Sequence, residues 1–393
     1  MSGRILFYCQ HLLGIGHLRR AATLARALAL AGHEVRLVSG GEAVPHLDCA
    51  PAALVQLAPV RAVDKFFKVL VDGDGRQIDD AFKDARARAL VGEFEAFRPD
   101  VVLTEMFPFG RRQLRFELIP LLEAAKAAPW RPRIASSVRD ILVMSPKPER
   151  IDEMLDLVRR YYDAVLVHGD RDLIPFDATF APAARIADRL VYTGYVVETG
   201  APERGPNAPG HGEVVVSAGG GAVSEPLLET ALAARPLTAL KDRVWRLLVG
   251  HNLPDDRFER LRAAGGSRVV VERARADFVT LLANAELSIS QGGYNTVMET
   301  LKFGRRAVVV PYAGGLETEQ TLRAGLLAQR GLIQVVDETT MTARSMAEAV
   351  ARALAGPTLS GRLSVDLDGM AKTVAAIGAL AEGGTSVTPA GRT

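Results

Sequence analysis

Residues 287–311 constrain the fold more than any other part of this sequence. LSIS (287–290) is typical of a buried strand, Gly292 and Gly293 form a turn, and TVMETLKFG (296–304) has the spacing of a helix that ends at Gly304. Asn295 and Thr296 are candidates to cap that helix, and AVVVP (307–311) indicates a second buried strand. A strand, a tight turn, a helix and another strand predict one unit of a parallel α/β sheet.

The same stretch has the order of elements found in anion-binding turns. A glycine turn at a helix start places unpaired backbone N–H groups and the positive end of the helix dipole at one point, which suits a phosphate. Glu299, one turn into the helix, could accept the two hydroxyls of a ribose, and Glu319 and Gln320 follow the next strand at the same edge of the sheet. The stretch therefore predicts half of a nucleotide-sugar pocket, with an ordinary βαβ turn as the alternative.

A second glycine turn lies in the same half of the chain. VVVS (214–217) is typical of a buried strand, and Gly219, Gly220 and Gly221 lead from it into a helical pattern. This order predicts a second anion-binding turn. A flexible loop is the alternative.

The N-terminal half opens with a similar unit. RILFYCQ (4–10) predicts a strand, a glycine-bearing loop and a helix up to Gly32 follow, and HEVRLVSGG (33–41) predicts the next strand. This is the start of a doubly wound sheet. It is a poor dinucleotide fingerprint, because Arg19 occupies the place of the third glycine and no acid ends the second strand. A nicotinamide enzyme is therefore disfavoured.

His17 is the candidate base of this half. It lies at the start of the first helix, at the carboxyl edge of the sheet, where ligands bind in such folds. The helix dipole disfavours a protonated imidazole, so His17 is expected to be neutral and able to accept a proton. A helix-capping histidine is the alternative role, and His11 in the same loop is the competing candidate.

Carboxylates at strand ends could orient that histidine. VVLTE ends in Glu105, and RIASSVRDIL places Arg139 and Asp140 at the end of another strand. Either carboxylate could hold the imidazole and stabilise it once protonated, and Glu105 is preferred. Arg111, Arg112 and Arg139 could bind an anionic acceptor, with salt bridges inside the loops as the alternative. Gly16 and Asp140 are further candidate acceptor contacts.

The length of the chain, 393 residues, favours two domains over one. A stretch dense in Gly and Pro at 197–212 predicts a linker between an N-terminal domain, 1–196, and a C-terminal domain, 213–367. Residues 368–383 indicate a terminal helix, and 384–393 a disordered tail.

Composition excludes several classes of protein. With 48% hydrophobic and 24% charged residues the chain is typical of a soluble globular protein, and a formal net charge of +2 gives no support to a nucleic-acid partner. Two cysteines, Cys9 and Cys49, indicate neither disulfides nor a cysteine metal site, which fits a reducing cytoplasm. The N-terminus has no signal-peptide pattern. Phe66 and Phe67, between two lysines, could contact an anionic membrane surface, although an edge that faces the core is favoured.

The pattern Gly-Gly-x-Asn-Thr-x-x-x-Glu, with Glu-Gln about twenty residues on, resembles the donor-site signature of inverting glycosyltransferases of the two-domain GT-B type, above all the MurG-like group. The resemblance implies two doubly wound, Rossmann-like domains facing across a cleft, with 368–383 crossing back to the first. It implies that Gly219–221 approach the diphosphate and that residues near Arg275 read the base. Many relatives have histidine where this chain has Gln291, which can still donate a hydrogen bond to phosphate but carries no charge.

The loop Gly14-x-Gly16-His17-x-x-Arg20 resembles the Gly-His loop of MurG-like transferases and that of the nucleotide-sugar hydrolase of pseudaminic acid synthesis. Both resemblances imply that His17 is the base or an acceptor contact. Gly16, the residue before it, is a candidate acceptor contact as well. Glu105 resembles the strand-end aspartate of plant-type glycosyltransferases.

Residues and resemblance together predict a metal-independent inverting glycosyltransferase. It would move a sugar from a nucleotide sugar, with UDP as the expected nucleotide, to an acceptor hydroxyl. A nucleotide-sugar hydrolase, a nucleotide-sugar 2-epimerase and a non-catalytic sugar-binding protein are the alternatives. No cofactor is expected besides the donor. The acceptor is either soluble or lipid-linked, and the expected location is the cytoplasm, with peripheral contact at the inner face of the membrane as a variant.

Overall fold

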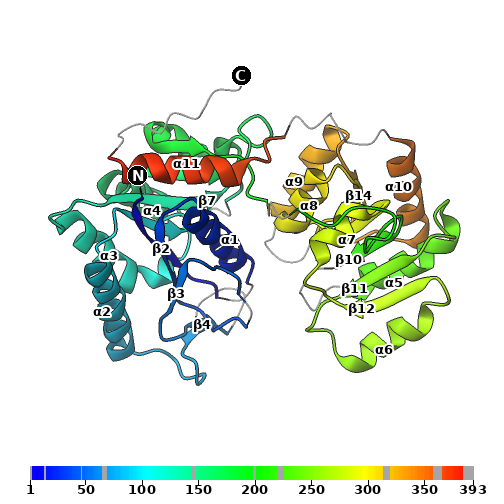
Figure 1. Cartoon of the computed structure of the whole chain (residues 1–393), viewed down its shortest axis with the longest axis horizontal. Helices are drawn as coiled ribbons and strands as arrows, with labels where there is room; N and C mark the ends of the chain where they lie inside the picture. The colour runs from blue at the N-terminus through cyan, green and yellow to red at the C-terminus, as the bar shows by residue number, and fades with distance from the viewer. Residues whose placement is uncertain are drawn as a thin grey trace. The chain divides into compact units, whose positions relative to one another are not determined.

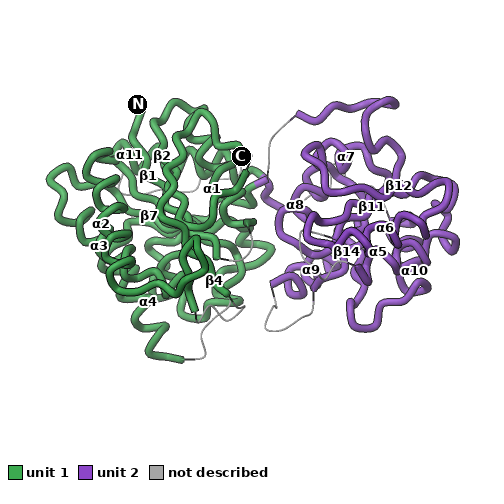
Figure 2. The backbone as a smooth tube through the Cα atoms, turned by 90° about the horizontal axis from the view of Figure 1, so that it is seen from below, with its two compact units in different colours: residues 1–196, 368–393 green, residues 197–367 purple. Residues whose placement is uncertain are grey.

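The computed structural model describes residues 2–12, 15–45, 47–63, 69–142, 147–197, 201–218, 225–312, 319–356 and 365–383. It forms two compact units, Met1–Val196 with Asp368–Thr393, and Val197–Leu367 (Figure 2). Four stretches on which the sequence analysis drew lie outside the described residues: Gly14, the Phe66–Phe67 pair, Gly219–221 and the tail 384–393.

Unit 1 contains a seven-stranded sheet of parallel strands in the order β3-β2-β1-β6-β7-β8-β9. Figure 1 labels β2, β3 and β7 of this sheet. Its strands are β1 (Arg4–Cys9), β2 (Glu34–Ser39), β3 (Ala53–Gln56), β6 (Val101–Glu105), β7 (Arg133–Arg139), β8 (Ala164–His168) and β9 (Leu190–Tyr192). A short antiparallel pair, β4 (Arg61–Ala62) and β5 (Leu70–Val71), lies outside that sheet. The strand order, with β1 inside the sheet and helical crossovers on both sides of it, is that of a doubly wound fold.

Helices cover both faces of this sheet because the strands are apolar on both sides. Ile5, Phe7 and Cys9 of β1 pack into one core with α1 (Gly16–Leu30) and α11 (Gly369–Ala381). Leu6 and Tyr8 point the other way, toward α2 (Asp80–Phe97), α3 (Arg115–Ala127) and α4 (Pro148–Tyr161). The alternation follows from the two-residue period of a strand.

The C-terminal helix α11 packs on unit 1. Ile377 and Leu380 share the core of Ile5 and Leu24, and Gly369 N–H donates to Tyr195 O at 3.1 Å. A Cβ at Gly369 would lie 2.4 Å from Gly194 O, so only glycine allows this close approach of the backbones.

Unit 2 repeats the design with a six-stranded parallel sheet in the order β12-β11-β10-β13-β14-β15. The strands are β10 (Val214–Ser217), β11 (Trp245–Val249), β12 (Val269–Arg273), β13 (Leu287–Gln291), β14 (Arg306–Val310) and β15 (Gln334–Val335). Its helices are α5 (Glu225–Ala234), α6 (Asp255–Ala264), α7 (Phe278–Asn284), α8 (Tyr294–Lys302), α9 (Glu319–Gln329) and α10 (Ala343–Ala355). The expected α/β class with two doubly wound sheets is confirmed.

The Gly/Pro-rich stretch predicted as a linker, 197–212, differs from that expectation over 201–212, which packs on unit 2. Asn284 Nδ2 donates to Glu203 O at 2.8 Å, and Gly212 N–H donates to Asn284 O at 3.2 Å. Gly210 has a φ of +84°, and a Cβ there would lie 2.5 Å from Leu281 O. Gly210 therefore serves close packing against Leu281 rather than chain flexibility.

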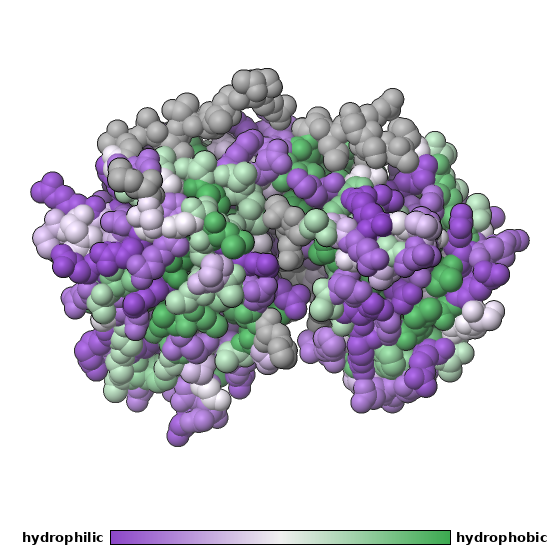
Figure 3. Space-filling model, viewed as in Figure 1, coloured by the Kyte–Doolittle hydropathy of each residue, from purple (hydrophilic) through white to green (hydrophobic). Residues whose placement is uncertain are grey.

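The surface of the described residues carries few large apolar side chains. The exposed ones come from different elements: Leu30, Leu54, Val63, Leu237 and Leu322. On the face drawn in Figure 3, hydrophilic and hydrophobic residues are interspersed over both units.

Candidate active site

His17 and Glu105 meet at the carboxyl edge of the sheet in unit 1. Glu105 is the last residue of β6, and His17 lies in the first turn of α1, with its Nδ1 2.9 Å from Glu105 Oε1. The Glu105 side chain is fully buried, whereas that of His17 is 21% exposed. Asp140, the other carboxylate considered as a partner, instead accepts a hydrogen bond from Tyr195 Oη at 2.7 Å. The structure therefore brings His17 to Glu105 and not to Asp140.

The charges around this pair determine its protonation. Burial raises the pKa of Glu105, but the Arg20 guanidinium and the hydrogen bonds from His17 and Ser137 outweigh it and hold that pKa below its ordinary value. Burial and the nearby Arg139 and Arg111 guanidinium groups lower the pKa of His17 to about 3, against the opposing effect of Glu105. His17 is thus neutral beside an ionised carboxylate at neutral pH.

The tautomer of His17 follows from its partner. An ionised carboxylate only accepts hydrogen bonds, so Nδ1 of His17 carries the ring proton and donates a hydrogen bond to Glu105. The lone pair is left on Nε2. From the sequence, the helix dipole alone predicts a neutral imidazole, and in the structure burial and two guanidinium groups lower its pKa.

Arg20 is a member of the site whose role the sequence analysis did not assign. It is 3% exposed and forms a buried ion pair with Glu105 Oε1. Its position three residues after His17 places both side chains on one face of α1, and this spacing is the signal that could have found it.

The three arginines proposed as acceptor contacts have different surroundings. Arg111 Nε donates to Gln10 O at 2.8 Å, and no ion pair joins Arg111 to a carboxylate in the described part of the chain. The Arg139 guanidinium lies near Gly16, 3.6 Å from the place that a Cβ there would occupy. Arg112 is an exposed residue that forms a salt bridge with Glu153 at 3.2 Å. Arg112 thus has a salt bridge of the kind that the alternative expected, and its role as an acceptor contact stays a prediction.

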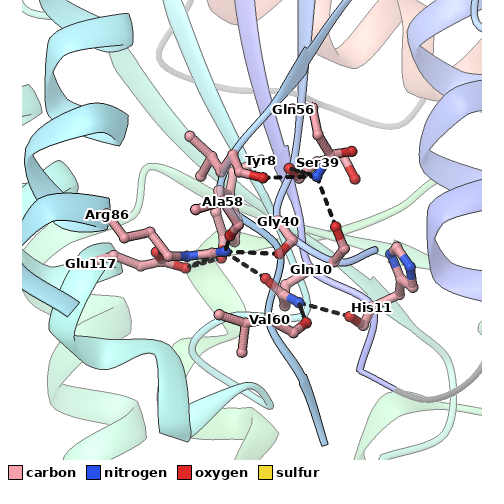
Figure 4. A network of polar contacts seen from close by, with 12 residues as sticks. Tyr8, Gln10, His11, Ser39, Gly40, Gln56, Ala58, Val60, Arg86 and Glu117 are labelled. Carbon is pink, nitrogen blue, oxygen red and sulfur yellow. Dashed lines mark hydrogen bonds and ion pairs between the residues drawn. The ribbon is translucent and has the colours of Figure 1, made fainter. Parts of the chain in front are cut away.

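A buried polar network holds the backbone beside this site (Figure 4). Arg86 of α2 and Glu117 of α3 form an ion pair whose side chains are fully buried. Arg86 also donates to Gly40 O at 2.8 Å and to Gln10 Oε1 at 2.7 Å, and Tyr8 Oη donates to Glu117. The network joins the chain after β1 to the chain after β2. No motif in the sequence indicated it.

His11, the competing candidate base, is part of the same packed region. It is 5% exposed, and a Cβ at Gly41 would lie 2.4 Å from His11 Cε1, so the ring packs against that glycine. Burial and the nearby Arg111 guanidinium lower the pKa of His11. In the described residues no carboxylate forms a hydrogen bond with His11 as Glu105 does with His17, so His17 remains the candidate base.

In unit 2, the turn between β13 and α8 differs in detail from the expectation. Gly293 is the N-cap of α8 and no side chain caps the helix, so Asn295 and Thr296 lie in the first turn instead of capping it. The glycine N–H groups are occupied, because Gly292 donates to Val310 O at 3.2 Å and Gly293 donates to Gln291 O at 2.8 Å. The amides that point out of the helix start are therefore those of residues 294–296, since Val297 is the first to bond back, to Gly293 O.

Side chains from α9 lie against this turn. A Cβ at Gly292 would lie 3.2 Å from Gln320 Cβ and 3.1 Å from Pro311 Cα, and Gln320 Oε1 accepts a hydrogen bond from Tyr312 N–H at 3.0 Å. The structure thus brings together Gln291, Gly292 and Gln320, with Glu319 beside Gln320 at the start of α9 and half-buried Glu299 on the second turn of α8.

Arg323 links the starts of α8 and α9, which the sequence analysis missed. Its side chain is 1% exposed and forms an ion pair with Glu319 at 2.9 Å. Its guanidinium carbon lies 5.1 Å from the centroid of the Tyr294 ring. The interval of four residues between Glu319 and Arg323 in a helical pattern is the signal that could have shown the pair.

Arg275 lies beyond the end of β12, and its side chain is engaged locally. Its Nε and Nη2 donate to the two carboxylate oxygens of Asp277 at 2.7 and 2.6 Å. A nucleobase would therefore meet the backbone here more readily than the Arg275 guanidinium.

Within the described ranges, His, Cys, Asp and Glu side chains form no group of three that could hold a metal ion, and no helix is long and apolar enough to cross a membrane.

Comparison with known proteins gives matches over both units. Residues 214–360 match the family model of the glycosyltransferase family 28 C-terminal domain. An uncharacterized glycosyltransferase of Methanosarcina mazei is 22% identical over 350 residues, which cover 86% of each chain. The UDP-N-acetylglucosamine–N-acetylmuramyl-(pentapeptide) pyrophosphoryl-undecaprenol N-acetylglucosamine transferase of Bartonella quintana is 34% identical over 83 residues, which cover 21% of this chain and 22% of that enzyme.

Two solved structures share the fold over nearly the whole chain. The MurG structure of Acinetobacter baumannii has a TM-score of 0.60 at 16% identity and covers 95% of this chain and 98% of its own. A putative UDP-N-acetylglucosamine 2-epimerase from Listeria monocytogenes has a TM-score of 0.63 at 13% identity and covers 100% of each chain. At such identities the likeness concerns the fold alone. Together with the family match and the relatives, it confirms the predicted fold type and the predicted resemblance.

Proposed function

We propose a reaction for this chain from the premise that it is a GT-B-fold glycosyltransferase of the MurG-like group, with a glycosyltransferase family 28 C-terminal domain. The reaction is transfer of a sugar from a nucleotide diphosphate sugar, with UDP as the nucleotide, to an acceptor hydroxyl with inversion at the anomeric carbon. One observation carries the proposal: His17 is neutral, its Nδ1–H is held by buried, ionised Glu105, and its Nε2 lone pair belongs to a partly exposed side chain.

The chemical step needs one base and one leaving group. His17 Nε2 takes the acceptor hydroxyl proton while the acceptor oxygen bonds to the anomeric carbon. The bond from that carbon to the donor phosphate oxygen breaks, and the nucleoside diphosphate leaves with the electron pair. The imidazolium that forms is stabilised by Glu105, the role of the carboxylate in base–orienter pairs. A single displacement on an α-linked donor gives a β-linked product.

The donor is assigned to the carboxyl edge of the sheet in unit 2. The amides of residues 294–296 and the positive end of α8 face the charge that develops on the leaving diphosphate, so the proposed step is independent of a metal. Gln291 donates to phosphate, Glu299 accepts the ribose hydroxyls, and Glu319 and Gln320 bind the sugar hydroxyls.

The acceptor is assigned to unit 1, beside His17. Arg111 and Arg139 both raise the local positive potential, as their effect on the pKa of His17 shows. We infer an acceptor with an anionic group, such as a phosphate or a carboxylate, next to its nucleophilic hydroxyl. A lipid-linked phosphate would bring the protein to the cytoplasmic face of a membrane as a peripheral enzyme.

The test is an assay with UDP-sugars in the presence and absence of candidate phosphorylated acceptors. We expect transfer only with an acceptor, and loss of transfer in His17→Ala while the exposed-histidine variant His211→Ala keeps the wild-type rate. A wild-type rate in His17→Ala would refute the mechanism. Free sugar released without acceptor would identify a hydrolase, and an altered sugar would identify an epimerase.

A further inference from the structure

The second oxygen of Glu105 is the start of a hydrogen-bonded chain that leads away from solvent. Oε1 faces His17 and Arg20, whereas Oε2 accepts a hydrogen bond from Ser137 Oγ at 2.8 Å. Ser137 Oγ also lies 2.9 Å from His168 Nε2. Glu105, Ser137 and His168 are all fully buried. Glu105 and His168 are the last residues of β6 and β8, and Ser137 lies two residues before the end of β7, the strand between them.

The direction of this chain follows from counting protons. The hydroxyl of Ser137 has one hydrogen, and ionised Glu105 can only accept it. His168 must therefore donate from Nε2 to Ser137 Oγ. A neutral imidazole with its proton on Nε2 has its lone pair on Nδ1.

The surroundings of His168 Nδ1 agree with that assignment. Thr193 Oγ1 lies 2.9 Å from Nδ1, while the carbonyl oxygens of Val167 and Gly194 are 3.4 Å from the same hydroxyl. Thr373 Oγ1, 3.4 Å from Nδ1, donates to Gly369 O at 2.6 Å. The Thr193 hydroxyl is thus the donor to Nδ1. Burial and Arg20 lower the pKa of His168, which keeps the ring neutral.

A serine and a histidine at hydrogen-bonding distance can also be a nucleophile and its base. That role needs a lone pair on the nitrogen that faces the serine, but Nε2 of His168 carries the proton. It also needs access for a substrate, and both Ser137 and His168 are fully buried. The hydrogen-bonded series of Ser137 and His168 therefore holds Glu105 in place and does not attack a substrate.

We propose that His168 is a positioning residue for the transfer reaction. By donating to Ser137 it directs the serine proton onto Glu105 Oε2, and this bond fixes the carboxylate in the orientation in which Oε1 meets His17 Nδ1–H. Without that donor the Ser137 hydroxyl is free to rotate, the Glu105 carboxylate is held less firmly, and its hydrogen bond with His17 Nδ1–H weakens. The effect on turnover rests on the proposed function.

The kinetic test compares four variants. We expect Ser137→Ala and His168→Leu to lower kcat by roughly 10- to 100-fold, the loss typical of outer groups that orient a catalytic ligand. The KM for the donor should stay within about twofold, because the residues assigned to the donor lie in unit 2. His168→Gln, whose Nε2 can donate from nearly the same place, should recover most of kcat relative to His168→Leu.

Ser136→Ala is the matched control. Ser136 is the neighbouring residue on β7, is equally buried and donates to Phe107 O at 2.8 Å, but among the described residues its side chain forms no hydrogen bond with Glu105, Ser137 or His168. It should keep a kcat near that of wild type at a comparable loss of melting temperature. Equal kcat values for His168→Leu and His168→Gln would overturn the proposal.

A spectroscopic test needs no substrate and so separates this proposal from the proposed function. Long-range 1H–15N spectra of the imidazoles should show His17 with its proton on Nδ1 and His168 with its proton on Nε2. In Ser137→Ala the proton and nitrogen shifts of His17 Nδ1–H should move in the direction of a weaker hydrogen bond to Glu105, and in Ser136→Ala they should not. Unchanged His17 shifts in Ser137→Ala would overturn the positioning role. If wild type turned over no UDP-sugar, the proposed function would fail, while these spectra would still decide the role of His168.

Discussion

His17 and Glu105 are joined at 2.9 Å although their side chains differ in exposure, 21% against 0%. The histidine can meet a substrate, while the carboxylate that orients it is shielded from water and held by Arg20 and Ser137. In this buried setting the electrostatic interaction of the carboxylate with the imidazole is stronger than it would be in water.

Replacement of Glu105 by Gln tests this relationship. A neutral amide neither stabilises the imidazolium nor requires the Nδ1–H tautomer, so we expect kcat to fall by about 10²- to 10⁴-fold. Glu117→Gln is a control, because Glu117 is an equally buried carboxylate paired with Arg86. It should lower stability but leave the kcat of the folded enzyme near that of wild type. Similar kcat losses in both variants would argue against a specific role for Glu105.

The plot of kcat/KM against pH should lack the decline on the acid side that an ordinary histidine base produces. With the pKa of His17 lowered to about 3, the base stays neutral well below pH 6. We therefore expect kcat/KM to stay within about twofold between pH 8 and pH 5, whereas an ordinary histidine would lose about tenfold per pH unit below 6.5. Steady-state rates in a constant-ionic-strength buffer series provide the measurement. A decline centred near pH 6.5 would contradict the assigned protonation.

The stability of the fold should depend on pH through His168. Its pKa is lowered from 6.5 to about 3 in the folded state, so the unfolded chain binds the proton more readily. The contribution of neutral His168 to the free energy of unfolding is fully present above pH 6.5 and is lost as pH falls toward 3. At pH 5 the loss is about 2 kcal/mol of unfolding free energy. Denaturant titrations at pH 7.5 and pH 5 should therefore show a smaller pH effect in His168→Gln than in wild type, and equal effects would count against it.

Two adjacent glycines should respond differently to alanine. A Cβ at Gly292 would meet Pro311 and Gln320, whereas a Cβ at Gly293 would meet nothing within 4 Å. We expect Gly292→Ala to cost about 1–3 kcal/mol of unfolding free energy, and Gly293→Ala to change it by less than about 0.5 kcal/mol. Calorimetric titration with UDP adds a test of the site. Weaker UDP binding in the stable Gly293→Ala variant would support a phosphate at the start of α8, and unchanged binding would oppose it.

Replacing one partner of the buried pair Arg86 and Glu117 should lower the unfolding free energy more than replacing both. Arg86→Met leaves a fully buried carboxylate without its cation, and we expect about 3–5 kcal/mol lower unfolding free energy. The double variant Arg86→Met with Glu117→Leu should recover part of that loss. Urea denaturation of wild type, both single variants and the double variant gives the coupling energy. Additive losses would show that the two residues stabilise the fold independently.

Much of unit 2 and of the sheet edges was predictable from local patterns. Short apolar runs bounded by glycine and proline indicated the strands β10, β13 and β14, and helical spacing indicated α1 and α8. Glu105 and Gln320 could be placed at a carboxyl edge because parallel strands present their ends on one side of a sheet. Arg20 and Arg323 have a local signal in their helical spacing from His17 and Glu319. The buried pair of Arg86 and Glu117 has none, because it depends on how α2 packs against α3.

The sequence by itself determined the elements of this protein, because strand and helix periods and glycine turns are local properties of the chain. Only the tertiary structure decided that His17 pairs with Glu105, 88 residues away, and not with Asp140. It also decided that burial and two guanidinium groups lower the pKa of His17, that Arg112 forms a salt bridge with Glu153, and that Ser137 and His168 form a hydrogen-bonded series with Glu105. The physical reason is that pairing, burial and pKa depend on groups that the fold brings together from separate strands and helices.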